Sequence, residues 1–168
     1  MELSQARLNP NPPNRDDHRM TIFLALHILY AVSLTVTAVI GWRYGGRSER
    51  WGVAIILVGS LLTVTVTNSA MFQWRTHRTP LIVVDALMLI PLVGLALVSS
   101  RFWPVWAAAF HLIALASHGA IYILPRGVVR AYAIFQGFWA YPIMACILIG
   151  AWSHHRATAP IAADPPRS

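Results

Sequence analysis

The sequence predicts an all-α protein, a five-helix transmembrane bundle, from its composition and from five long apolar runs. Of its 168 residues, 57% are hydrophobic and only 11% are charged, and the mean hydropathy is +0.56. A soluble protein carries about 25% charged residues. A fold in water would leave too much apolar surface uncovered with so little charge. A chain that crosses a lipid bilayer several times is therefore expected.

Five apolar runs define the expected spans, because each is close to the roughly 20 residues that a helix needs to cross a bilayer. They are residues 21–40, 51–72, 81–100, 102–124 and 131–152. After Thr63 the second run alternates hydroxyl and apolar side chains, as a strand does. An unclosed strand in lipid would leave its backbone unpaired, so a helix is expected there as well. Gly59, Thr63 and Thr67 recur every four positions and predict close contact with a neighbouring helix.

The two ends of the chain are predicted to be disordered polar tails, residues 1–20 and 153–168. Both are rich in proline, which prevents a helix from continuing. The single cysteine, Cys146, lies within an apolar run and cannot form an internal disulfide.

All thirteen basic residues are arginines in the short segments and tails around the apolar runs. With five spans, seven arginines fall on the side of the N-terminus and six on the other side. The positive-inside rule therefore gives little preference, and a cytoplasmic N-terminus is the working expectation. No continuous basic face is available to neutralise phosphates, so nucleic-acid binding is not expected. The expected partners are the lipid bilayer, other membrane proteins and further copies of this chain.

The fourth run contains two histidines, His111 and His118, and no Asp, Glu, Lys or Arg. Seven positions apart, they share one face of a helix and lie roughly 10.5 Å apart along its axis. Ionisable residues within a membrane are costly and usually turn toward other helices. This face is the best candidate in the chain for a functional site.

Each predicted span also contributes one strongly polar side chain at a similar depth. Successive spans run in opposite directions, so depth can be compared at about 1.5 Å per residue. Measured from the N-terminal side, five residues fall at roughly 6–9 Å: His27, Asn68, Asp85, His118 and Gln136. His111 lies deeper, at roughly 19 Å. We expect His27, Asn68, Asp85 and His118 to point toward one another.

This predicted polar layer has three interpretations. The first is a purely structural set of hydrogen bonds between helices. The second is ligation: His27, Asp85 and His118 have the donor types of a metal site with two histidines and a carboxylate. Two histidines from different helices, among His27, His111 and His118, could also hold haem b, although His111 and His118 are too far apart to bind one ion together. The third is a proton or solute path, in which a carboxylate beside a histidine relays a proton. Nothing resembles a nucleophilic triad or a phosphate loop, so an enzyme is not the expected class.

Several short motifs in the second half of the chain carry a resemblance. They are Arg101-Phe102-Trp103-Pro104, Trp106-Ala107-Ala108, Arg130-Ala131-Tyr132-Ala133 and Phe138-Trp139-Ala140-Tyr141-Pro142. Through these motifs, residues 80–150 resemble uncharacterised small multi-spanning inner-membrane proteins of sphingomonad-type alphaproteobacteria. Those proteins have no assigned activity. The resemblance implies a bacterial inner-membrane location and no chemistry.

The functional expectation is an integral inner-membrane protein that acts through helix–helix contacts, as an accessory or assembly component. Two alternatives stay open. One is a small haem- or metal-binding redox protein. The other is a proton- or solute-conducting protein that uses the intramembrane His and Asp residues.

Overall fold

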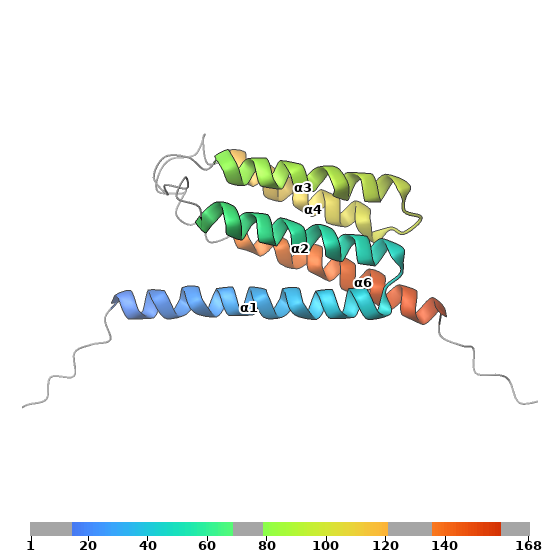
Figure 1. The fold of residues 1–168 in the computed structure, drawn as a ribbon, viewed down its shortest axis with the longest axis horizontal. Helices are drawn as coiled ribbons and strands as arrows, with labels where there is room; N and C mark the ends of the chain where they lie inside the picture. Colours follow the sequence, from blue (N-terminus) through green and yellow to red (C-terminus); the bar gives the residue numbers. More distant parts are fainter. Residues whose placement is uncertain (1–14, 69–78, 121–135, 159–168) are drawn as a thin grey trace, which may run out of the picture. The chain divides into compact units, whose positions relative to one another are not determined.

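The structure, a computed structural model, describes residues 15–68, 79–120 and 136–158. Within these ranges it consists of helices and contains no strand, which confirms the predicted all-α class. The elements are α1 (Arg15–Tyr44), α2 (Arg47–Asn68), α3 (Thr79–Val98), α4 (Trp103–Ala120), the short 3-10 helix η1 (Gln136–Trp139) and α6 (Ala140–Thr158) (Figure 1).

The chain divides into two compact units, residues 1–32 and residues 33–168. The described part of the first unit is the N-terminal half of α1. The second unit contains the remainder of α1, from Ser33, and all the later helices.

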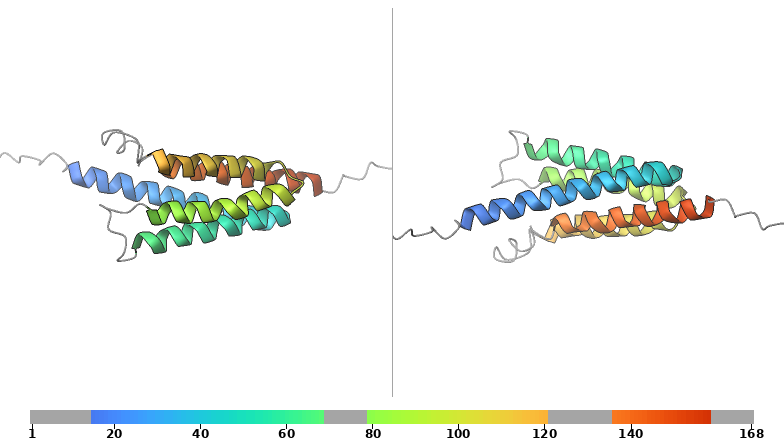
Figure 2. Two further views of the ribbon diagram at one scale, coloured as in Figure 1. Left: turned by 90° about the horizontal axis from the view of Figure 1, so that it is seen from above. Right: turned by 90° about the horizontal axis from the view of Figure 1, so that it is seen from below.

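The second unit is organised around an antiparallel bundle of α2, α3, α4 and α6. Helix α2 packs against α3, α3 against α4, α4 against α6, and α6 against α2, so the four helices form a closed ring (Figure 2). Neighbouring helices in this ring run in opposite directions (Figure 1). All four contribute to the buried apolar core, which includes Val53, Ile56, Val84, Leu92, Ala107, Ala114, Met144 and Ile147.

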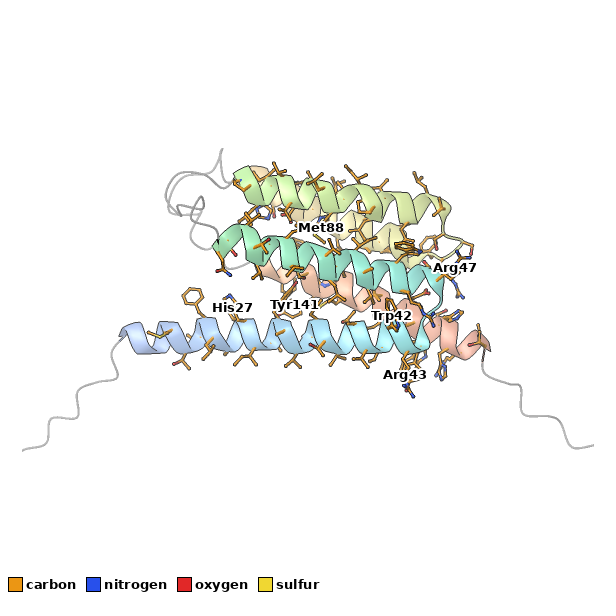
Figure 3. The ribbon with its side chains drawn as sticks, viewed as in Figure 1. His27, Trp42, Arg43, Arg47, Met88 and Tyr141 are labelled. Carbon is orange, nitrogen blue, oxygen red and sulfur yellow. The ribbon has the colours of Figure 1, made fainter. Side chains whose placement is uncertain are left out.

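Glycines allow close approach between these helices. A Cβ at Gly59 of α2 would overlap Met88, which reaches across from α3 (Figure 3). The predicted close contact at Gly59 is therefore made, and its partner is α3. The hydroxyl of Thr63 donates to the Gly59 carbonyl at 2.9 Å, and that of Thr67 donates to the Thr63 carbonyl at 2.8 Å. These two threonines satisfy their hydroxyls within α2.

Several helix ends differ from the predicted ones. Helix α1 begins at Arg15 and α6 continues to Thr158, so both predicted tails are too long. A helix need not stop where its apolar run stops, because polar side chains at its ends can reach water. Basic side chains are also favourable near a helix C-terminus, and His155 and Arg156 lie in the last turn of α6.

The predicted fifth span, residues 131–152, is not one uninterrupted α-helix in its described part. Residues 136–139 form η1, and α6 begins at Ala140. Pro142 falls in the first turn of α6, where its missing N–H removes no intrahelical hydrogen bond. The proline therefore favours a helix start at this point.

Three helical stretches are long and apolar enough to cross a membrane: Met20–Tyr44, Arg47–Asn68 and Pro80–Val98. With 22 and 20 residues, α2 and α3 are about 33 and 30 Å long, close to the roughly 30 Å of a bilayer core. The predicted fourth and fifth spans both include residues between 121 and 135, which lie outside the described ranges. The five-span topology stays a prediction.

The outer faces of α2 and α3 are apolar. Only 22% of the most apolar stretch of α2 and 17% of that of α3 are buried within the bundle. The exposed side chains include Leu57, Val58, Leu61, Val83, Leu87 and Ile90. A contiguous apolar surface of this kind is unfavourable in water but not in lipid.

Candidate functional site

An acid–base pair joins α3 to α4. The Nε2 atom of His118 lies 2.6 Å from Oδ2 of Asp85, and the two side chains are 9% and 19% exposed. Asp85 lies near the start of α3 and His118 near the end of α4, so the antiparallel helices bring them to one level. Val84 and Ala114 beside them are buried and apolar. A hydrogen bond is electrostatically stronger in such surroundings than at a wet surface.

His111 contacts the same residue of α3. Its Nε2–H donates to the backbone carbonyl of Asp85 at 2.9 Å. Carbonyl groups in an α-helix point toward the helix C-terminus, and along α3 that direction leads toward the earlier residues of α4. His111 therefore meets the Asp85 carbonyl, whereas His118 meets its carboxylate. We call these three residues the Asp85 cluster.

Of the other members of the predicted polar layer, the structure describes the side chains of His27 and Asn68. His27 lies in the first unit, where its Nδ1–H donates to the Phe23 carbonyl at 2.7 Å and its side chain is exposed. Asn68 is exposed at the end of α2. Gln136 opens η1, and its side chain lies outside what the structure describes. Of the four side chains expected to meet, the structure joins Asp85 and His118.

The geometry also limits how the predicted ligands could bind a metal ion or a haem iron. Among the described residues, no three His, Cys, Asp or Glu side chains form a group that could hold a metal ion. Two of the three predicted ligands, Asp85 and His118, are bonded to each other. The Nε2 atoms of His111 and His118 both contact Asp85, so a metal or haem iron bound at either atom would have to displace a hydrogen bond.

A second polar centre, which sequence reasoning did not identify, is built on Glu49 at the other end of the bundle. This carboxylate is 1% exposed. Its Oε2 accepts the Gly46 N–H at 2.8 Å, and its Oε1 accepts the indole N–H of Trp103, also at 2.8 Å. The first bond is one half of a capping box, in which a Glu in the first turn bonds back to the residue that precedes the helix.

Trp103 connects three helices. It is the first residue of α4, and its indole lies between Gly52 of α2 and Gly150 of α6. A Cβ at Gly52 would overlap the ring, and a Cβ at Gly150 would lie 2.5 Å from Trp103 Cδ1. The Gly46-to-Glu49 spacing is a local signal that sequence reasoning could have used. The two glycines that receive Trp103 are distant in the sequence and carry no such signal.

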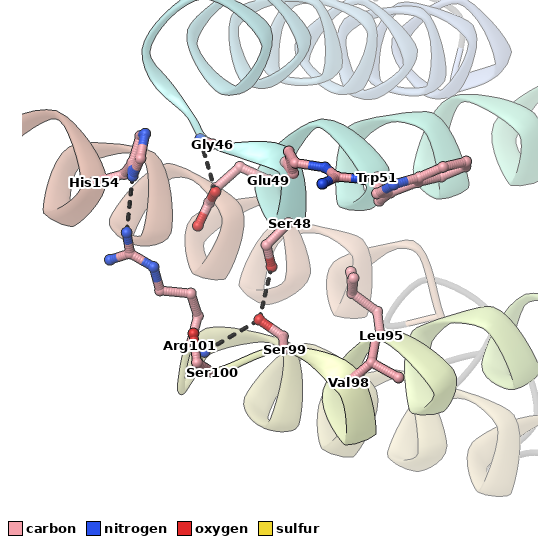
Figure 4. Close-up of a pocket in the computed structure, with 11 residues that line it drawn as sticks. Gly46, Ser48, Glu49, Trp51, Leu95, Val98, Ser99, Ser100, Arg101 and His154 are labelled. Atoms are coloured by element: carbon pink, nitrogen blue, oxygen red, sulfur yellow. Dashed lines mark hydrogen bonds between the residues drawn. The ribbon is translucent and has the colours of Figure 1, made fainter.

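Beside Glu49, a cleft of about 430 Å³ opens at this end of the bundle (Figure 4). We call it the arginine cleft. Arg101 is held in it by two hydrogen bonds: its backbone N–H donates to Ser99 Oγ at 3.1 Å, and Nη2 donates to His154 Nδ1 at 2.8 Å. Ser48 Oγ lies 3.0 Å from Ser99 Oγ. The lining comprises Gly46, Arg47, Ser48, Glu49, Trp51, Leu95, Val98, Ser99, Ser100, Arg101 and His154.

The same end of the bundle carries exposed aromatic side chains and arginines. The Arg156 guanidinium lies 5.0 Å from the centre of the Trp152 ring, and that of Arg50 lies 6.0 Å from the Trp42 ring. Arg43 and Arg47 are nearby (Figure 3). The exposed aromatic residues here include Trp42, Tyr44, Trp51, Phe102, Trp106 and Trp152. Trp and Arg in this combination are typical of a membrane–water interface.

Comparisons of the chain with protein-family profiles, with curated proteins and with solved structures find no match. The functional interpretation therefore depends on the Asp85 cluster, the Glu49 centre and the arginine cleft.

Proposed function

We propose that this chain is an integral membrane protein whose Asp85 cluster binds and releases a proton inside the membrane. The observation that supports this most directly is the 2.6 Å contact between Asp85 and His118. Ionisable residues in a membrane segment are costly and are typical of proton relays and ion pathways. The three long apolar helices and the apolar outer faces of α2 and α3 support the membrane location.

The cluster has the chemistry that proton exchange requires. Imidazole is the side chain whose ordinary titration range lies closest to physiological pH. His118 can lose a proton from one ring nitrogen while the other still donates to Asp85. The Asp85 carboxylate can in turn accept a proton. The contact between α3 and α4 can therefore persist in more than one protonation state.

The surroundings of the cluster favour access from one face of the membrane. Asp85 is 13 residues from the end of α3 at Val98, so it lies about 20 Å from the arginine-rich end of the bundle. Between the cluster and that end, the described core includes the buried apolar side chains Leu92, Ala107 and Ala108. The structure therefore better supports a proton that enters from the membrane face opposite the arginine-rich end than a proton that crosses the whole bundle.

Infrared spectroscopy of the full chain in lipid bilayers tests this proposal. As the pH is lowered, a protonated carboxyl band should appear that is missing in Asp85→Asn, and His118→Gln should move the pH at which it appears. Glu49→Gln is the matched control, because it removes a buried carboxylate that lies outside the cluster. A spectrum unchanged by Asp85→Asn, or a band removed by Glu49→Gln instead, would contradict the proposal.

A second candidate is an accessory or assembly role that uses helix–helix contacts. It is favoured by the exposed apolar face of α3, which includes Leu87 and Ile90 and could pack against another membrane helix. Native mass spectrometry in mild detergent should then show a complex that Leu87→Trp dissociates and Leu61→Trp on α2 does not. A strictly monomeric protein would rule out a stable assembly.

A bacterial inner-membrane location for either role is supported by the resemblance described above.

A further inference from the structure

We propose that the arginine cleft binds the phosphate of an anionic phospholipid. This site is separate from the Asp85 cluster, and the inference does not depend on proton exchange there. It rests on the charge of the cleft, on the way Arg101 is held, and on the apolar wall beside it.

The cleft has a net positive charge. Arg47 and Arg101 both line it, and Glu49 is the single carboxylate among its lining residues. Glu49 is 1% exposed, and its two oxygens already accept the N–H groups of Gly46 and Trp103. Among the described residues, the salt bridge in the structure is the one between His118 and Asp85, and no arginine takes part in it. An anion entering the cleft would therefore meet two guanidinium groups without displacing an acidic partner.

Arg101 is positioned before any ligand arrives. His154 Nδ1 accepts one guanidinium N–H, and Ser99 Oγ accepts the backbone N–H. A guanidinium has about five N–H donors in a planar fork that suits phosphate oxygens. The bond to His154 uses one of them and fixes the orientation of the others. Holding a donor group in place reduces the entropy that binding would otherwise cost.

The apolar side of the cleft distinguishes a lipid from a free anion. Trp51 of α2 and Leu95 and Val98 of α3 line it, and Trp51 and Val98 are exposed. This wall continues into the apolar outer faces of the two helices. A phosphate at Arg47 and Arg101 would therefore leave the acyl chains of its lipid against an apolar surface. The exposed Trp side chains at this end place the cleft at headgroup level.

The test uses the purified full chain in nanodiscs of phosphatidylcholine, with or without phosphatidylglycerol, and native mass spectrometry to count retained lipids. Phosphatidylglycerol should be retained in preference to phosphatidylcholine. Arg101→Gln and Arg47→Gln should each weaken its binding roughly tenfold, because each removes a charge-assisted contact. Among the described residues, the Arg47 side chain makes no hydrogen bond or ion pair, so its variant guards against misfolding of the Arg101 variant. Arg43→Gln is the matched control, since Arg43 lies at the same end but outside the cleft.

Two results would overturn the proposal. Equal weakening by Arg43→Gln would mean that the arginines attract the anionic leaflet in general and that the cleft is not a specific site. Binding of inorganic phosphate in detergent as tight as that of the lipid, and equally sensitive to Arg101→Gln, would identify a free-anion site instead.

Discussion

The fit of Trp103 against Gly150 predicts that adding a single methyl group there will destabilise the bundle. In Gly150→Ala, the new Cβ would lie 2.5 Å from Cδ1, 2.7 Å from Nε1 and 2.9 Å from Cγ of the Trp103 ring. Non-bonded carbon atoms prefer separations of about 3.5–4.0 Å. The ring cannot move aside freely, because Gly52 lies against Cη2 and Cζ3 at its other edge and Glu49 holds its N–H.

The expected magnitude follows from two opposing effects. Overpacking a core costs about 1–3 kcal/mol, whereas replacing a helical glycine by alanine normally stabilises by about 0.5–1 kcal/mol. The overlap involves three atoms of a rigid ring, so we expect the cost to exceed the gain and the net loss to be about 1–2 kcal/mol. Gly94→Ala on α3 is the control, because a Cβ there meets nothing within 4 Å. That variant should be as stable as the parent or up to about 1 kcal/mol more stable.

Reversible unfolding in mixed micelles, followed by circular dichroism, measures both variants on one scale. Combining Gly150→Ala with Trp103→Leu should make the alanine much less costly, because the ring that it contacts is gone. If Gly150→Ala and Gly94→Ala change the free energy of unfolding in the same direction, Trp103 does not occupy the position described.

Three further predictions concern other parts of the chain. Glu49→Gln should lower the free energy of unfolding by about 1–3 kcal/mol, because an amide nitrogen cannot accept the hydrogen bond that a carboxylate oxygen accepted; an unchanged unfolding curve would show that one of the two bonds is not formed. Gly59→Leu should destabilise the bundle by overlap with Met88 in the same unfolding assay, and a neutral result would place α2 and α3 farther apart than described. Reporter fusions at residues 5 and 165 should report opposite sides of the membrane if the chain has five spans, and signals from the same side would require an even number.

The Asp85 cluster shows what the sequence could predict. Helix rise alone placed Asp85 and His118 at a similar depth in neighbouring antiparallel spans, and they are bonded in the structure. The seven-residue spacing placed His111 on the same face as His118, and both contact Asp85. Depth did not reveal that His111 would reach the backbone carbonyl of that residue. Depths were compared for side chains alone, and the backbone carbonyl groups were left out.

The Glu49 centre shows what the sequence could not predict. Glu49 lies in a segment rich in glycine and arginine, where a solvated acidic residue is the ordinary expectation. Its burial depends on Trp103, which is 54 positions away, and on the glycines that receive the indole. The start of α1 and the end of α6 were also predicted at the limits of the apolar runs, and both helices extend beyond those limits. Hydropathy marks the expected membrane core and not the length of a helix.

The central claim is that Asp85 and His118 form a direct bond within a membrane-embedded bundle, and solid-state NMR of the full chain in lipid bilayers tests it most directly. Dipolar recoupling between ¹⁵N-labelled histidine and ¹³C-labelled aspartate carboxyl groups should give a strong coupling between His118 Nε2 and the Asp85 carboxyl carbon, as the 2.6 Å N–O contact requires. That coupling should disappear in Asp85→Asn. A well-resolved His118 signal with no coupling to any aspartate carboxyl group would contradict the account.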